Sequence, residues 1–238
     1  MKYSSLIKTT IAAALIALTV PAQAAITISE VSPYSSGNSV YGKDWFELTN
    51  TGASAVNISG WKVDDNSNAF ASSLGLRGVT SIAAGQSVVF IESDATGSTD
   101  AAVNSAFVSA WFGSSAPLGL AIGNYGGSGI GLSTAGDAVN IFDGSGTVVT
   151  RVDFVASTTG RTFDNAAGLN NVSLTQLSSL GVNGAFNSVT ALTSGVPVGT
   201  LDIGSPGSIA AVPEPETYAL LLAGLALIGS IARRRKSA

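Results

Sequence analysis

Residues 44–65 read DWFELTNTGASAVNISGWKVDD, and this stretch decides the fold because its apolar residues recur with a period of two. Phe46 and Leu48 fall on one face of a strand at residues 45–50, whereas Glu47 falls on the opposite face. A Ser59-Gly60 turn then separates two further short apolar segments. Short strands divided by turn residues predict an all-β fold.

The same pattern continues on both sides of this stretch. Residues 25–31 (AITISEV) alternate in the same way, and residues 87–92 (SVVFIE) are apolar on both faces, which predicts a central strand. The clearest hairpin joins residues 137–142 to residues 147–155 through a turn at residues 143–146 (DGSG). Strands at this spacing predict an antiparallel, immunoglobulin-like β-sandwich.

One short helix is predicted at residues 100–112. Ser98 or Thr99 can cap its N-terminus, and Gly113 can end it. Its apolar positions share one face: Val103, Phe107, Ala110 and Trp111. We expect this helix to cover an open edge or end of the sandwich.

The first 24 residues have the layout of a secretory signal peptide. Lys2 and Lys8 lie in a basic region before the apolar stretch 11–20, and small residues end the segment. This layout predicts cleavage by signal peptidase between Ala24 and Ala25, and therefore export. The alternative, an N-terminal membrane anchor, has an apolar run of about half the ~20 residues that a spanning helix requires.

A second apolar segment lies near the other end of the chain. Residues 217–232 contain no charge, and a basic cluster follows them directly. The cluster consists of Arg233, Arg234, Arg235 and Lys236. Such a cluster stays on the cytoplasmic side of a membrane, so the segment predicts a single transmembrane helix, although it is short against a ~30 Å bilayer core. The alternative is a buried helix of a soluble domain.

A VPEP motif precedes this predicted helix. Its members are Val212, Pro213, Glu214 and Pro215. The prolines favour an extended backbone, which a protease can bind. Motif, apolar helix and basic cluster together resemble the PEP-CTERM sorting signal of Gram-negative bacteria. The resemblance implies anchoring in the inner membrane, processing by exosortase, which is a membrane-embedded cysteine protease, and delivery to the outer envelope or the extracellular matrix.

Composition excludes several classes of function. The chain has no cysteine and no histidine, which excludes disulfides, Ser-His-Asp triads and histidine-based zinc sites. Between the two terminal segments, five basic side chains stand against thirteen acidic ones, a net charge of −8. A surface of this charge repels phosphate backbones, so nucleic acid is not an expected partner.

Five motifs occur in an order that resembles the lamin tail domain, an immunoglobulin-like sandwich. They are ITISEV at 26–31, the opening stretch at 44–65, SIAAGQSVVFIES at 81–93, GLSTAGDAVNIFDGSGTVVTRVDF at 131–154, and DIGSPG at 202–207. Residues 156–198 match no part of this pattern by eye. The chain therefore divides into a signal peptide at 1–24, a lamin-tail-like domain at 25–209, and a sorting signal with a transmembrane helix at 210–238.

Two kinds of side chain are candidates for ligand binding or catalysis. Trp45 lies opposite Phe46 and Leu48 and is the tryptophan predicted to be exposed, as a possible contact for a sugar ring, with core or edge packing as the alternative; Trp61 is expected in the core. Glu30 and Glu47 are predicted on strands that can neighbour each other, and paired carboxylates are what a glycosidase requires. The lamin tail resemblance instead implies a structural role for both glutamates.

No cofactor is expected, with calcium as the one alternative. Asp64, Asn66 and Asn68 alternate oxygen ligands like the first half of a calcium loop, but the turn glycine and the final glutamate of such a loop are missing. A second candidate set lies across the predicted hairpin: Asp137, Asp143 and Asp153.

The sequence thus predicts an exported, non-enzymatic envelope or extracellular-matrix protein with a structural or adhesive role and no assigned catalytic residue. Its expected partners are signal peptidase, exosortase and extracellular polysaccharide or surface proteins. The alternative is a carbohydrate-active enzyme that uses Glu30 and Glu47.

Overall fold

The computed structural model describes residues 26–114, 116–127, 129–208, 224–225 and 228. Its main feature is a pair of five-stranded sheets, which we call the first and the second sheet. The first sheet has the order β11 (Phe163–Asp164), β1 (Ile26–Ser32), β2 (Trp45–Asn50), β7 (Ser87–Ser93), β8 (Ala121–Gly126). The second has the order β12 (Ser173–Leu174), β10 (Val148–Phe154), β9 (Asp137–Phe142), β4 (Lys62–Asp64), β5 (Leu74–Gly75). Two small pairs complete the fold: β3 (Val56–Asn57) with β6 (Ser81–Ile82), and β13 (Phe186–Ala191) with β14 (Leu201–Gly204).

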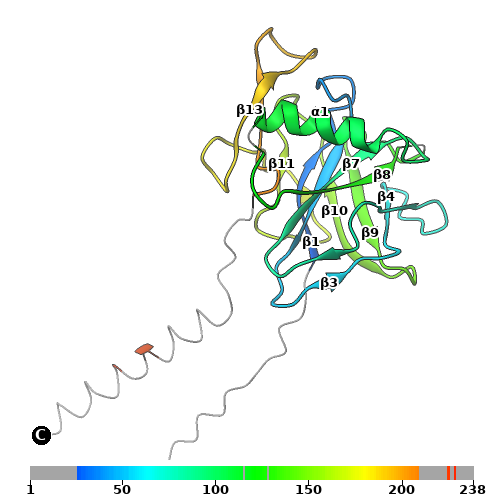
Figure 1. Cartoon of the computed structure of the whole chain (residues 1–238). Coiled ribbons are helices and arrows are strands. Elements are labelled where there is room, and N and C mark those ends of the chain that lie inside the picture. Colours follow the sequence, from blue (N-terminus) through cyan, green and yellow to red (C-terminus); the bar gives the residue numbers. More distant parts are fainter. Residues whose placement is uncertain (1–25, 115, 128, 209–223, 226–227, 229–238) are drawn as a thin grey trace, which may run out of the picture.

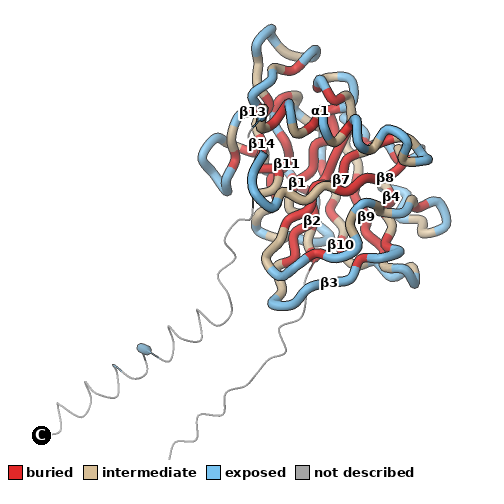
Figure 2. The backbone as a smooth tube through the Cα atoms, viewed as in Figure 1, coloured by how far each residue is buried: buried red, intermediate tan, exposed pale blue. Residues whose placement is uncertain are grey.

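The main core lies between the two sheets. Phe46 and Leu48 of β2 face inward, as the alternation predicts, and pack with Val139 of β9 and Val152 of β10. Buried positions follow the strands, whereas the loops are largely exposed (Figure 2). The predicted β-sandwich is therefore confirmed, and because the described residues contain no disulfide, its stability depends on this core.

Strand pairing differs from the prediction in two places. β7 is a central strand as predicted, but its pairing with β8 is parallel, and β12 also joins β10 in parallel. The predicted antiparallel pairing is therefore wrong for these two strand pairs and confirmed for the other pairs of the two sheets. A helix connects β7 to β8, and such a crossover returns the chain in its original direction.

The predicted helix is present as α1 (Asp100–Phe112), with Gly113 at its C-cap in the left-handed region at φ 64°. Its buried residues are the predicted ones: Val103, Phe107, Ala110 and Trp111. The helix packs against Val89 and Ile91 on the outer face of the first sheet and against Phe186 of β13 (Figure 1). This position follows from the central strand, because the second apolar face of β7 must also be covered.

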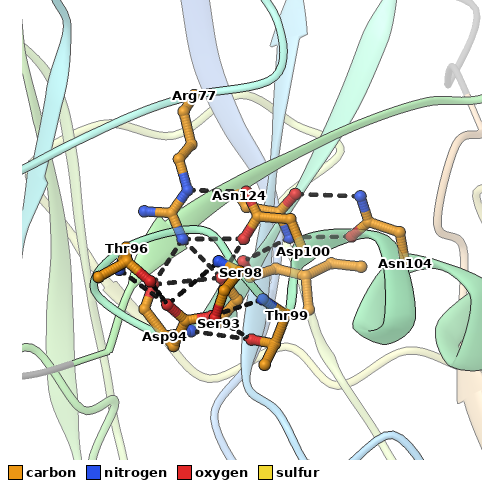
Figure 3. A network of polar contacts seen from close by, with 10 residues as sticks. Arg77, Ser93, Asp94, Thr96, Ser98, Thr99, Asp100, Asn104 and Asn124 are labelled. Atoms are coloured by element: carbon orange, nitrogen blue, oxygen red, sulfur yellow. Dashed lines mark hydrogen bonds and ion pairs between the residues drawn. The ribbon is translucent and has the colours of Figure 1, made fainter.

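A polar network fixes the start of α1 to the sheet (Figure 3). The Arg77 guanidinium donates to both carboxylate oxygens of Asp100, at 2.8 and 2.9 Å, and to the Asp94 carbonyl at 2.7 Å. Thr99 makes no side-chain cap. Instead, the Asp94 carboxylate accepts the Thr99 backbone N–H and hydroxyl, at 2.6 and 2.5 Å.

We expect Arg77→Lys to lower the free energy of unfolding by about 1–2 kcal/mol, because an ammonium group cannot reproduce the bidentate contact with Asp100. Urea denaturation monitored by circular dichroism measures this loss. Arg161→Lys is the control, since Arg161 is exposed and takes part in none of the ion pairs of the described residues. Equal losses in both variants would contradict a special role for Arg77.

Residues 156–208 belong to the same sandwich, although residues 156–198 match none of the five motifs. β11 extends the first sheet beside β1, β12 extends the second, and β14 runs back toward β1. Among the residues that the structure describes, no helix has the length and apolar content needed to cross a membrane. The predicted signal peptide, the sorting motif and nearly all of the predicted transmembrane helix lie outside the described residues.

Candidate functional site

Glu30 and Glu47 lie directly opposite each other on β1 and β2. A β-bulge between Ile28 and Glu30 shifts the register, so that Glu30 meets Glu47 on the outer face of the first sheet. Both side chains are only 1% exposed. The expectation that these glutamates occupy neighbouring strands is confirmed. Their burial is unusual, because acidic side chains are rarely removed from solvent.

The carboxylate oxygens of this pair accept hydrogen bonds from the DIGSPG motif. Glu30 Oε1 accepts the Ser205 backbone N–H at 2.8 Å, and Glu30 Oε2 accepts the Ser205 hydroxyl at 3.0 Å. Glu47 Oε2 accepts the Gly207 backbone N–H at 2.6 Å. We call this arrangement of Glu30, Glu47, Ser205 and Gly207 the carboxylate clasp, because it holds the end of the sandwich domain against β1 and β2.

Further hydroxyl groups complete the clasp. Thr162 donates to Glu30 Oε1 and also contacts the Ser178 hydroxyl, while Ser29 donates to Glu47 Oε1 at 2.7 Å. Gly204 passes so close to the pair that an added Cβ would lie 2.6 Å from Glu30 Oε1. The close approach of the backbone therefore requires glycine at this position of the motif.

The electrostatics of the clasp follow from its burial. Burial, together with a smaller contribution from the neighbouring Glu47 charge, raises the pKa of Glu30 to about 8. Burial also raises the pKa of Glu47, to about 7, although hydrogen bonds from Ser29 and Gly207 oppose the shift. Two adjacent buried carboxyl groups resist double ionisation, so the pair retains a proton near neutral pH.

The clasp leaves little space for a substrate. A cavity of about 20 Å³ lies beside Glu47 and is lined by Thr27, Ser29 and Thr49 among others. Ligand pockets occupy roughly 300–1,000 Å³, so this cavity has room for a water molecule but not for a sugar ring. The geometry makes the glutamate pair a structural contact between strands and the C-terminal segment.

Trp45, the predicted ligand contact, is fully buried. Its indole packs edge-on against Phe107 and Trp111, at 5.6 and 5.9 Å between ring centroids, and its Nε1 donates to the Tyr41 hydroxyl at 3.1 Å. The prediction that Trp45 is exposed is wrong, because α1 covers that face of the strand. Trp61 lies in the core between the sheets, as predicted.

The acidic side chains of both candidate calcium sets bind nearby backbone N–H groups, hydroxyl groups or an arginine. Asp64 accepts the Ser67 hydroxyl and the Ala69 backbone N–H, both at 2.6 Å, and so holds its own turn. The hairpin acids also have separate partners, since Asp143 bonds within its turn and Asp153 pairs with Arg151 at 2.5 Å. Asp137 accepts backbone N–H groups of Ser133 and Asn66. Within the described residues, no group of three or more acidic side chains is arranged to hold a metal ion.

Sequence reasoning missed the partners of the glutamates. Ser205 and Gly207 lie about 160 residues or more from the carboxylates that bind them, and their contribution is partly through backbone N–H groups. The one available signal was the DIGSPG motif itself, whose glycine and proline mark a backbone of special shape.

These features define a β-sandwich module whose final motif closes over a buried glutamate pair. The family model for the Lamin Tail Domain matches residues 19–156, more than half of the chain, and the chain belongs to this family. The model for the PEP-CTERM protein-sorting motif matches residues 211–236. No curated protein and no solved structure matches the chain.

Both matches agree with the resemblances drawn from the sequence. Neither family is a catalytic one, and the sorting motif implies export and processing by exosortase. The lamin tail match ends at residue 156, whereas the sandwich continues through β11, β12 and the clasp at 205–207. The structural domain is therefore longer than the part that the family model matches.

Proposed function

We propose that this protein is a non-enzymatic component of the outer envelope or extracellular matrix, with a structural or adhesive role. The observation that carries the proposal is the combination of a sorting motif with a sandwich whose paired carboxylates are closed off by the chain itself. In such a protein the folded domain is what reaches the envelope or the matrix, and its outer surface contacts the other components there.

The clasp supports this proposal because of its position in the sequence. Gly207 is bound by Glu47 and lies five residues before Val212, the first residue of the sorting motif. Five residues span at most about 18 Å, at roughly 3.5 Å per residue. The clasp thus attaches the sandwich to the chain only a few residues before the segment on which exosortase acts. A pulling force on the C-terminal end of the chain would act on β1 and β2 through the hydrogen bonds of the clasp.

The proposed route has three steps. Signal peptidase cleaves between Ala24 and Ala25, and residues 217–232 anchor the exported chain in the inner membrane with the basic cluster 233–236 on the cytoplasmic side. Exosortase then cleaves at or near Pro213-Glu214-Pro215. The product passes to the outer envelope or the extracellular space.

Intact mass spectrometry of the protein from membranes and from culture medium of its host tests the route. We expect an extracellular product that runs from Ala25 to the vicinity of Pro213. A double variant, Pro213→Ala with Pro215→Ala, should retain its C-terminal end and accumulate in membranes, whereas the control Pro197→Ala, in a loop outside the motif, should be processed normally. An extracellular product that still carries residues 233–236 would contradict the proposal.

Co-sedimentation with extracellular polysaccharide from the same host tests the adhesive role. We expect the processed protein to sediment with the polysaccharide and to remain there in high salt, because a domain of net charge −8 has no basic patch for purely ionic retention. Absence of binding to both polysaccharide and isolated envelopes would reject an adhesive function and leave a structural one.

A further inference from the structure

The sequence contains one Asn-Gly pair, Asn183–Gly184, in the loop between β12 and β13. The pair occupies the two central positions of a tight turn, which the Ala185 N–H closes by donating to the Val182 carbonyl at 2.9 Å. Both central residues have positive φ, 49° for Asn183 and 83° for Gly184, as in a type I′ turn. Residues 182–184 are exposed, so water reaches the pair.

An asparagine followed by glycine carries a nucleophile and an electrophile that can react with each other. The backbone nitrogen of Gly184 can attack the side-chain carbonyl carbon of Asn183, and no Cβ on Gly184 hinders its approach. Among the described residues, no hydrogen bond uses the Gly184 N–H. The Asn183–Gly184 peptide can therefore rotate into position without loss of a bond from this nitrogen.

The reaction of this pair needs only water as a second reactant. A bond forms between the Gly184 nitrogen and Asn183 Cγ, the bond from Cγ to Nδ2 breaks, and the Gly184 proton leaves with Nδ2 as ammonia. Water then adds to one of the two carbonyl carbons of the succinimide ring and opens it to aspartate or isoaspartate. No atom is oxidised or reduced, and the product has a carboxylate where the amide was.

An Asp-Gly pair, Asp143–Gly144, can cyclise by the same route, but its surroundings differ. Asp143 Oδ1 accepts the Ser145 hydroxyl at 2.6 Å and the backbone N–H groups of Ser145 and Thr147 at 2.8 and 2.9 Å. These hydrogen bonds hold the carboxyl group in its own turn and lower the pKa of Asp143, so that the group is ionised and resists attack. The structure thus distinguishes two pairs that the sequence alone makes similar.

The Asn183 amide has a partner that the reaction would turn into a source of repulsion. Asn183 Nδ2 donates to Asp164 Oδ2 at 2.8 Å. Asp164 belongs to β11 and pairs directly with Glu30 of the carboxylate clasp. Deamidation replaces this donor by a carboxylate, so two negative groups would meet at the distance of the present hydrogen bond.

The turn also contacts the C-terminal end of the clasp. A Cβ added to Gly184 would lie 3.0 Å from the Cβ of Ser208, the residue that follows Gly207. Asn183 and Ser208 both line the cavity beside Glu47. A new charge on residue 183 would therefore enter the wall of this cavity, next to the segment that the clasp holds.

We propose that Asn183 is a site of spontaneous deamidation and that its product loosens the carboxylate clasp. The carboxylate repels Asp164 beside Glu30, and isoaspartate adds one carbon to the backbone of the turn against Ser208. Because the loss of ammonia is irreversible, the modified form accumulates with the age of the protein.

Peptide mapping of the full-length protein after incubation in mildly alkaline buffer tests the site. Mass spectrometry and labelling with isoaspartyl methyltransferase identify the products. We expect Asn183 to react at least about tenfold faster than Asn187, which precedes a serine and lies within β13, and Asp143 to remain unmodified. Asn183→Gly, which accepts the positive φ of the turn, should abolish the signal. Equal rates at Asn183 and Asn187 would overturn the proposal.

Hydrogen exchange of Asn183→Asp tests the effect on the clasp. We expect exchange at the Ser205 and Gly207 amides to accelerate about tenfold, whereas Asn187→Asp, with the same change of charge at another exposed position, should leave it unchanged. Adding Asp164→Asn to Asn183→Asp should restore slow exchange, because an amide can again donate to a carboxylate at this contact. Equal exchange in the two single variants, or no rescue in the double variant, would overturn the link between Asn183 and the clasp.

Discussion

Glu30→Ala is expected to lower the free energy of unfolding by about 3–5 kcal/mol, because the substitution leaves several buried donors without an acceptor. The Ser205 backbone N–H, the Ser205 hydroxyl and the Thr162 hydroxyl all donate to this carboxylate. Alanine also leaves a cavity beside Gly204. Urea denaturation of the purified protein, monitored by tryptophan fluorescence, measures the loss.

Glu30→Gln is the matched control for this variant. The amide keeps the size of the side chain and one acceptor oxygen, and it removes the repulsion between Glu30 and Glu47, so we expect a loss below about 1.5 kcal/mol. Hydrogen exchange at the Ser205 and Gly207 amides should accelerate strongly in Glu30→Ala and only slightly in Glu30→Gln. Unchanged exchange at both amides in Glu30→Ala would show that the clasp does not hold the C-terminal segment.

The protein is expected to be most stable at mildly acidic pH and to lose several kcal/mol as the pH rises to about 9. The pKa of Glu30 is raised from 4.5 to about 8, and the pKa values of Glu47 and Asp44 are raised to about 7, in each case chiefly by burial. Between the unfolded and folded pKa values, the folded state holds more protons than the unfolded state. Stability therefore falls as pH rises through this window, by about 1.4 kcal/mol per pH unit for each extra proton held.

A different set of acids limits stability at the other end of the range. Hydrogen bonds from Thr96 and Thr99 hold the pKa of Asp94 below its usual range, and Arg77 does the same for Asp100. These carboxyl groups lose their favourable contacts when they are protonated, so stability should also fall below about pH 4.

Urea titrations at closely spaced pH values measure this profile. The double variant Glu30→Gln with Glu47→Gln should make the alkaline limb less steep, because neither amide titrates while Asp44 still does, and should leave the acid limb unchanged. A wild-type protein that gains stability between about pH 5 and pH 9 would contradict the sign of the argument.

Local patterns predicted the elements of the fold well. The alternation at residues 45–50, the apolar run at residues 87–92 and the hairpin turn at 143–146 all became the expected strands and turn, because each depends on residues close together in the chain. The helix at Asp100–Phe112 was predicted for the same reason, down to its buried face.

The failed predictions concern what each element packs against. Trp45 was correctly predicted on the face of its strand opposite Phe46 and Leu48. That face is buried because α1 packs on it, which the alternation along the strand does not reveal. The parallel pairing of β7 and β8 likewise results from the path of the helix between them. For Glu30 and Glu47, the sequence indicated that they can neighbour each other but not that Ser205 and Gly207 cover them.

The sequence by itself determined the class of this protein: a lamin-tail-type sandwich followed by a sorting motif, without histidine or cysteine chemistry. Periodicity, turn residues and terminal motifs are local properties, so they can be read along the chain. Only the tertiary structure decided that the segment after β14 closes the glutamate pair, through Ser205 and Gly207. The reason is physical, since the burial and the hydrogen-bond partners of a carboxylate depend on segments more than 100 residues away, and no local pattern specifies them.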